Sequence, residues 1–453
     1  MTQFIVVQVG QCGNQIGCRF WDYALREHTL LKDTVAENSA LWNFFRPAHE
    51  SSGSLRARAV MIDMEEGVIN STLRTPLGNL FTNHQMVTDV SGSGNNWAVG
   101  FYEYGSKYRS TIVEKIRKEA ELCDCLQGFF LLHSLGGGTG SGLGSAVLQM
   151  LKDEFPSVFR FVTSVIPSAT DDVVTSPYNT ALAFEKIAEF ADCSCPVENQ
   201  ALINICDQLQ KVQRSTTKDT SAYSKLGQRK QAFDQINSIV AYLLLNLTSS
   251  SRFPGSLNVD LNELCTSLVP YPKLHFLVSS VTPLHHIFDA SLPSRRLDQM
   301  FSDAFSANHQ LVQCNVKSGA LLACTLLARG NVSISDIRRN VERIRSELRF
   351  VHWNQDGWKT GLCSVPPIGA QPHSLLMLAN ATCIRHTMDR LRTDAAKLYT
   401  RKAHLHHFLK VAGMEETHFG DALAQLGEVS AEYKTLETTD YSRLVLPRLG
   451  VLL

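Results

Sequence analysis

Short apolar runs alternate with longer amphipathic stretches over the first half of the chain. The runs FIVVQVG, ARAVMIDM, GFFLLHS and RFVTSVI are each followed by Gly, Ser or Asp. Short runs separated by helical periodicity indicate parallel strands with helices on both faces of the sheet. The pattern predicts an α/β domain over residues 1–210. In such a domain the loops at the carboxyl ends of the strands form the natural binding edge.

The pattern changes after this domain. Residues 211–230, KVQRSTTKDTSAYSKLGQRK, have almost no apolar periodicity and predict a polar loop. The following QAFDQINSIVAYLLLNL is apolar around nearly its whole circumference, as expected for a helix buried on all sides. We therefore predict a core helix over residues 231–252 that joins two domains.

A second region of mixed pattern follows the core helix. Over residues 253–380 the runs LHFLVSS, ALLACTLLARG, LRFVHW and SLLMLAN predict the strands of a second α+β domain. Residues 381–453 contain two long amphipathic stretches, IRHTMDRLRTDAAKLYTRKAHL and EETHFGDALAQLGEVSAEYKTLE. These predict a C-terminal helical pair.

Composition narrows the class of protein. Among the 453 residues, 43 Lys+Arg balance 43 Asp+Glu, so the chain lacks the basic field of a nucleic-acid or anionic-membrane binder. Its beginning resembles a strand rather than a signal peptide, and its longest apolar stretch is about half of the ~20 residues that span a membrane. The 12 cysteines lack the spacing of a structural zinc site. We expect a soluble, intracellular protein with reduced thiols.

The strongest chemical signal is the stretch GFFLLHSLGGGTGSGLGSAVLQM, in which a buried strand ends at Ser134 and a helix begins near Ser141. Glycines let successive backbone N–H groups converge on an anion, and a helix N-terminus adds partial positive charge. The stretch lacks the Gly-Lys-Ser/Thr of a Walker A loop and the G-x-G-x-x-G register of dinucleotide folds. A flexible glycine linker is disfavoured, because strand and helix flank the glycines closely. The stretch predicts a phosphate site.

Three further turns follow apolar runs of the same domain. VGQCGNQIG places Gln11 and Cys12 at the sheet edge, and SGSGNNW supplies a polar turn at residues 91–97. DMEEG, at residues 63–67, supplies carboxylates at a strand end. A phosphate cradle without lysine needs a cation, so Glu65 is a candidate to hold Mg²⁺ directly or through water. The alternative is that these acids are solvated loop residues.

The motifs GGGTGSG, GQCGNQIG, SGSGNNWAVG, SPYN, RFPGSLNVDLNE, VPYPKLHF and GMEE occur in the order found in the tubulin family. The resemblance extends over essentially the whole chain. It implies a Rossmann-type GTP-binding domain with a parallel sheet, an intermediate domain and a C-terminal helical pair. MIDMEEGVI, VHWNQDGWKTGLCSVPP and KAHLHHFLKVAGMEE, together with a longer polar loop after Cys206, resemble the epsilon branch of that family.

The resemblance also implies a GTP/GDP site with Mg²⁺. The residues that it places at the phosphates and the metal are Gln11, Cys12, Glu65 (the Mg²⁺ residue), Asn95, Ser134, Gly137, Gly138, Thr139 and Gly140. Those that it places at the sugar and the base are Asp172, Asn199, Phe233 and Asn237, with Phe233 stacking on the ring and Asn237 reading the guanine edge. Two departures stand out: Phe233 lacks the hydroxyl usual at its position, and Ser176 replaces a glutamate.

Glu263, in NVDLNE, matches the acid with which alpha-tubulin positions a water on the nucleotide of the neighbouring subunit. The resemblance therefore implies that any GTPase activity is shared between two chains. The alternative is an ordinary exposed glutamate on a helix.

The resemblance implies a cytoskeletal protein of centrioles, centrosomes and basal bodies, acting in their assembly and in triplet microtubule organisation. Its implied partners are other tubulins, of alpha, beta or delta type, and centriolar proteins, with no nucleic acid and no membrane. The final YSRLVLPRLGVLL is apolar and slightly basic, unlike the acidic tails of alpha- and beta-tubulin. Two alternatives stay open: a general lattice subunit resembling a divergent beta-tubulin, and a self-sufficient GTPase.

Overall fold

The structure is a computed structural model that describes residues 2–30, 41–48, 54–168, 171–216, 225–284, 295–369 and 371–438. Its first half is built around a six-stranded sheet with the order β5-β4-β1-β6-β7-β8, in which all pairings are parallel. The strands are β1 (Gln3–Val9), β4 (Ala59–Asp63), β5 (Met86–Thr88), β6 (Leu126–Ser134), β7 (Phe159–Ile166) and β8 (Cys193–Glu198). A small hairpin pairs β2 (Phe45–Pro47) with β3 (Leu55–Ala57). The predicted parallel sheet is confirmed.

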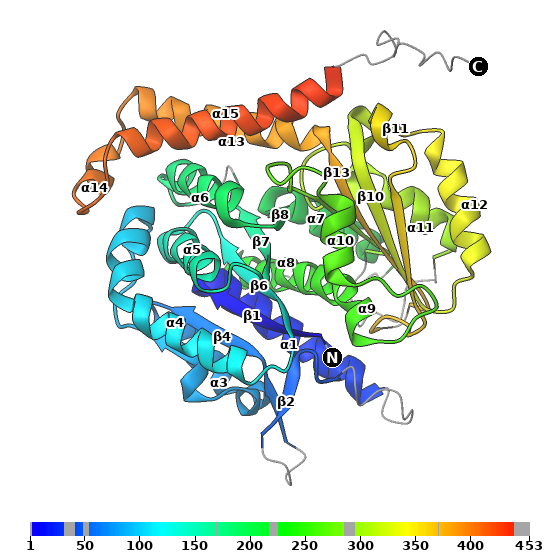
Figure 1. The fold of residues 1–453 in the computed structure, drawn as a ribbon, viewed down its shortest axis with the longest axis horizontal. Helices are drawn as coiled ribbons and strands as arrows, with labels where there is room; N and C mark the ends of the chain where they lie inside the picture. Colours follow the sequence, from blue (N-terminus) through cyan, green and yellow to red (C-terminus); the bar gives the residue numbers. More distant parts are fainter. Residues whose placement is uncertain are drawn as a thin grey trace, which may run out of the picture.

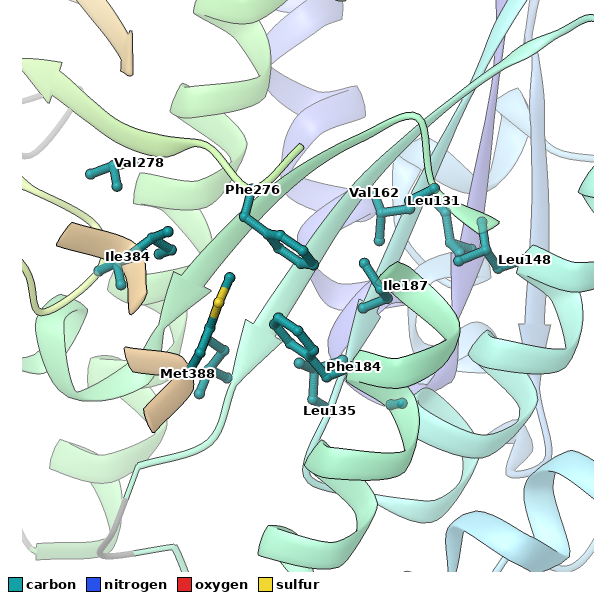
Figure 2. Close-up of a cluster of buried hydrophobic side chains, with 14 of the residues drawn as sticks. Leu131, Leu135, Leu148, Val162, Phe184, Ile187, Phe276, Val278, Ile384 and Met388 are labelled. Carbon is teal, nitrogen blue, oxygen red and sulfur yellow. The ribbon is translucent and has the colours of Figure 1, made fainter. Parts of the chain in front are cut away.

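Helices cover both faces of this sheet, which explains why its strands are apolar on both sides. Every residue of β1 is buried. The helices are α1 (Gly10–Leu30), α3 (Glu66–Leu73), α4 (Gly105–Glu121), α5 (Gly144–Glu154), α6 (Ser176–Phe190) and α7 (Asn199–Thr216). Figure 1 shows α4 and α5 on one side of the sheet and α1 and α8 on the other. The first face packs a core that includes Leu131, Val162, Phe184 and Ile187 (Figure 2).

The core helix α8 (Lys225–Leu247) lies between the two halves of the molecule, and its residues from Val240 to Leu247 are all buried. The helix of the structure begins at Lys225 and ends at Leu247, whereas the sequence predicts a helix over residues 231–252. Together α7 and α8 occupy both ends of the predicted loop 211–230, and residues 217–224 lie outside the described residues. The reason is that Lys, Gln and Arg are good helix formers, so polarity alone does not end a helix. The short α9 (Ser249–Arg252) follows after a break at Thr248.

The second sheet has the order β11-β10-β13-β9. Its fifth strand, β12, pairs with β10, as β11 does. Its strands are β9 (Val278–Thr282), β10 (Ala320–Arg329), β11 (Arg349–Phe350), β12 (Trp358–Cys363) and β13 (Ser374–Ala381). Its helices are α10 (Leu261–Leu268), α11 (Leu297–Ala304) and α12 (Ile334–Arg345). The backbone of Ser194 on β8 bonds to His275 and Leu277 at 2.9 and 2.8 Å, which joins the two sheets.

The predicted helical pair consists of α13 (Arg385–Thr400) and α15 (Thr417–Thr438), joined through the short α14 (Leu405–Leu409). The pair lies across α6 along one side of the molecule (Figure 1). All twelve cysteines are free thiols. Within the described ranges, no helix has the length and apolar composition needed to cross a membrane.

Candidate functional site

The carboxyl ends of neighbouring strands β4, β1 and β6 bring the glycine-rich turns together. Gly10, directly after β1, has a φ of 72°, which favours glycine. A side-chain carbon at Gly10 would lie 3.0 Å from the backbone nitrogen of Gly140. The turn after β1 and the loop after β6 are therefore in direct contact, as the sequence predicts.

Side chains of helix α6 donate hydrogen bonds to the backbone carbonyl groups of the glycine-rich loop. The carbonyl oxygen of Gly136 accepts hydrogen bonds from Asn179 Nδ2 at 2.8 Å and Ser176 Oγ at 3.3 Å, and that of Leu135 accepts one from Thr180 Oγ1 at 3.3 Å. In a trans peptide the N–H points opposite to the C=O. The N–H groups of Gly136 and Gly137 therefore point away from α6, as an anion cradle requires.

Asn179 also fixes the polar turn at residues 91–97. Its Nδ2 donates to the carbonyl oxygen of Asn95 at 2.8 Å, and its Oδ1 accepts from the Trp97 N–H at 2.9 Å. Asn95 has a φ of 54°, a conformation that asparagine tolerates better than most residues. Sequence reasoning assigned Asn179 no role. The available signal was an asparagine, a poor helix former, inside the helix that begins with SPYN.

At two positions of the cradle, Gly138 and Gly140, there is no room for a side chain. A side-chain carbon at Gly138 would lie 2.3 Å from Ser93 Oγ and 2.6 Å from the Asn96 nitrogen, and one at Gly140 would lie 2.4 Å from Ser134 Oγ. At Gly137 the nearest such atom is Asn95 Oδ1 at 3.9 Å, so this position faces open space.

Thr139 contributes a hydroxyl to the same edge, where its Oγ1 lies 3.0 Å from Ser93 Oγ. The structure thus brings together all four predicted cradle residues, Gly137 to Gly140, with Ser134 and Asn95.

Gln11 and Cys12 occupy the first turn of α1 beside the cradle. Gln11 is exposed and Cys12 is half-buried. Burial raises the pKa of the Cys12 thiol to about 12, because a thiolate would lose its hydration there. The thiol is therefore neutral at pH 7 and does not repel an anion in the cradle.

Two acids at the end of β4, Asp63 and Glu65, differ in their burial. Glu65 is exposed, but a side-chain carbon at Gly92 would lie 2.3 Å from its Oε1, so the carboxylate lies against the polar turn. Asp63 is buried, and its Oδ2 has no hydrogen-bond partner. Desolvation raises the pKa of Asp63 to about 6. Sequence reasoning named Glu65 and gave Asp63 no separate role, since only burial distinguishes the two.

The residues that the resemblance places at the sugar and the base of the nucleotide come from three segments. Asn237 is buried on α8, and its Nδ2 donates to Gln15 Oε1 on α1 at 3.3 Å. Phe233, one turn earlier, is 49% exposed, so its ring is accessible to a planar base. Asn199 begins α7 and is half-buried, and Asp172 is exposed in the segment before α6. The structure thus places Asn237 beside α1.

Glu263 lies on α10, away from these turns. Asp260, the N-cap of α10, accepts a hydrogen bond from Gln127 at the start of β6, whereas the cradle follows the end of that strand at Ser134. At ~3.3 Å per residue, the two positions are ~23 Å apart along the strand. Glu263 forms an ion pair with Lys359 of β12. Cradle and Glu263 therefore occupy opposite edges of the sheet.

A parallel sheet whose carboxyl edge carries converging glycine turns, a neutral thiol and a buried carboxyl with one unpaired oxygen defines an α/β protein with a phosphate-binding cradle. Residues 3–207 match the model of the Tubulin/FtsZ family, GTPase domain, and residues 272–393 match the Tubulin C-terminal domain. The chain is 53% identical to the tubulin epsilon chains of Mus musculus and Homo sapiens, with all of each chain covered. It is 34% identical to the tubulin beta-1 chain of Chondrus crispus, covering 96% of this chain and 94% of that one.

The chain belongs to the tubulin family, and its full-length similarity to epsilon chains confirms the predicted branch. Membership of the GTPase-domain family implies that the protein binds GTP or GDP.

Proposed function

We propose that this GTP-binding protein docks longitudinally on another tubulin through the surface around Glu263, and that it acts in centriole and basal-body assembly and triplet microtubule organisation. The observation that carries docking is an exposed aromatic pair on that surface. Tyr271 and Trp353 are 46% and 38% exposed, with ring centroids 5.7 Å apart. Exposed aromatic side chains are the residues that most often dominate protein interfaces.

The aromatic pair and the ion pair join the same two segments. Glu263 and Tyr271 lie on α10 and just after it, while Lys359 and Trp353 lie on β12 and just before it. A partner seated on the aromatic rings would therefore meet the Glu263 carboxylate. That carboxylate is the group we propose to position water on the partner's nucleotide, so that hydrolysis depends on assembly.

Docking is tested with purified αβ-tubulin as the partner. We expect Trp353→Ala to weaken binding by about 30-fold, because a buried aromatic anchor contributes ~2 kcal/mol. Ile334→Ala is the matched control, since Ile334 is an exposed apolar residue on α12, outside this surface. Sedimentation equilibrium measures both. Equal binding by the Trp353→Ala variant and the parent would remove the aromatic pair from the interface.

Glu263→Gln separates docking from chemistry. It is expected to leave binding within a few-fold and to slow GTP hydrolysis in the partner. Turnover by the isolated protein would instead favour the self-sufficient GTPase, and incorporation of the tagged chain along cytoplasmic microtubules would favour the general lattice subunit. The centriolar role rests on the similarity to epsilon chains.

We also propose that Mg²⁺ is held at this edge by Asp63, with Glu65, directly or through water. The residues fit the ion, because Asp63 Oδ2 is a buried, unpaired oxygen. The described residues contain no group of three or more His, Cys, Asp or Glu side chains that could hold a metal by themselves, so phosphate oxygens and water would complete the shell. When bound, the ion neutralises phosphate charge.

We also propose which residues contact the base, the sugar and the phosphates of the nucleotide. Phe233 would stack on the base and Asn237 would read its edge, supported by the exposed ring and the buried amide beside α1. Asn199 and Asp172 would contact base and sugar, and Asn95 and Gln11 the phosphates, on the resemblance alone.

Asp63→Asn tests the cation site through stability. A carboxyl with a raised pKa contributes its stability below its usual pKa and loses it as pH rises toward about 6. At pH 7 the ion-free protein therefore bears a cost of about 3 kcal/mol, which the amide removes. We expect Asp63→Asn to raise the melting temperature in EDTA and to abolish the further rise on adding Mg²⁺. Glu66→Gln, an exposed acid three positions on, is the control. An unchanged response to Mg²⁺ would place the ion elsewhere.

A further inference from the structure

A cleft of 590 Å³ lies between α6 and α15, on the side of the molecule away from the cradle turns. Its floor is apolar and includes Phe190, Ala191 and Val429. Figure 1 shows α15 crossing above α6, and Figure 2 shows Phe184 and Ile187 of α6 turned into the core beneath. A cleft of this size accommodates several side chains.

The α15 wall of the cleft is acidic. Asp421, Glu428 and Glu432 line it at spacings of seven and four residues, which place them on one helix face. Glu432 lies 3.7 Å from Lys273, whereas Asp421 and Glu428 have no ion-pair partner among the residues that the structure describes.

Five acidic and three basic side chains line the cleft, and the buried base among them, Arg160, is held by partners other than the α15 acids. Its guanidinium pairs with Asp192 at 2.7 Å and donates to the carbonyl oxygens of Phe155, Val158 and Phe190. The cleft therefore presents an apolar floor and an acidic wall, which suit a segment with apolar and basic side chains.

The chain contains such a segment directly after α15. Residues 443–448, RLVLPR, carry four apolar side chains between two arginines, and the segment follows a helix that ends at Thr438. Left in water, so dense an apolar run would be unfavourable. A tethered segment also has an effective concentration of about millimolar, which favours it over free competitors.

The distance between the two arginines of the segment matches the distance between two acids on the cleft wall. Arg443 and Arg448 are five residues apart, or ~16 Å in an extended chain. Glu432 and Asp421 are eleven residues apart on a helix, also ~16 Å. Arg443 lies five residues beyond Thr438, so ~16 Å of chain is available to return the ~9 Å from the helix end to Glu432.

We propose that residues 443–448 fold back antiparallel to α15 and dock in this cleft, with Arg443 beside Glu432 and Arg448 beside Asp421. In this arrangement the two arginines neutralise part of the acidic face of α15. The inference does not depend on the Glu263 surface or on the nucleotide.

Photo-crosslinking of the full chain tests the proposal. Benzoylphenylalanine replaces Leu446, and equal amounts of ¹⁴N- and ¹⁵N-labelled protein are mixed before irradiation and mass spectrometry. We expect crosslinks within single chains, to residues 188–192 or 421–432. Crosslinks between labelled and unlabelled chains would show docking on a second copy, and crosslinks without preference for the cleft would show no docking there. Either result overturns the proposal.

A second experiment measures the crosslinking yield after the charges of the α15 acids are reversed. In the double variant Asp421→Lys and Glu428→Lys, the intrachain yield is expected to fall at least 5-fold, with unchanged circular dichroism. Glu342→Lys, an exposed acid on α12, is the matched control and leaves the yield unchanged. An unchanged yield in the double variant would contradict the proposed recognition.

Discussion

Gly137→Ala is expected to weaken GTP binding by about 100-fold while leaving the fold intact. The added methyl meets no protein atom closer than Asn95 Oδ1 at 3.9 Å, and it projects into the open space of the cradle. There it would keep a phosphate away from the loop N–H groups, and hydrogen bonds to a charged group contribute ~1.5–3 kcal/mol each. Isothermal titration with GTP measures the loss.

Gly138→Ala is expected to act differently. Its methyl would overlap Ser93 Oγ and the Asn96 backbone, so it should lower the free energy of unfolding by ~1–3 kcal/mol as well as binding. Gly420→Ala, inside α15 with no atom within 4 Å, is the control, and it should bind GTP normally and gain up to ~1 kcal/mol of stability. Normal GTP binding by Gly137→Ala would show that the cradle is not the phosphate site.

Glu27→Gln is expected to lower the free energy of unfolding by ~3–5 kcal/mol, because it leaves two buried arginines without a counter-charge. Glu27 Oε2 accepts from Arg252 Nη1 at 2.6 Å, and Oε1 accepts from Arg329 Nη1 at 2.9 Å. Both guanidiniums are fully buried, and Phe253 lies 4.9 Å from one and 5.7 Å from the other. The triad joins α1, α9 and β10, so the two sheets should separate more easily in the variant.

Urea denaturation followed by circular dichroism measures this loss. Asp153→Asn, which breaks an ion pair that is nearly half exposed on both sides, should cost less than ~1 kcal/mol. Desolvation acts to raise the pKa of Glu27, but the attraction and hydrogen bonds of Arg329 and Arg252 together outweigh it and lower that pKa. Its contribution is therefore present above the usual pKa of a glutamate and is lost as pH falls through the lowered value. Equal losses in the two variants would mean that the buried triad contributes no more than a surface pair.

Several buried polar residues around the cradle have roles that their local sequence does not reveal. His133 is fully buried, its Nδ1–H donates to the carbonyl oxygen of Gly140 at 2.9 Å, and burial lowers its pKa to about 4. In the sequence it is only a histidine at the end of an apolar strand. Asn179 and Asp63 are similar cases, because partners distant in the chain create their roles.

The sequence by itself determined the parallel sheet, the buried core helix, the C-terminal pair and the glycine-rich cradle. Each depends on periodicity, or on glycine at a turn, and these act over a few neighbouring residues. The sequence does not predict β5, β8 and β12, because neighbouring strands rather than their own composition hold them in place. Only the tertiary structure decided that Asp63 is the buried acid, that Glu263 lies at the opposite edge from the cradle, and that Glu27 joins two arginines. Burial and charge pairing arise between segments hundreds of residues apart, so no local pattern encodes them.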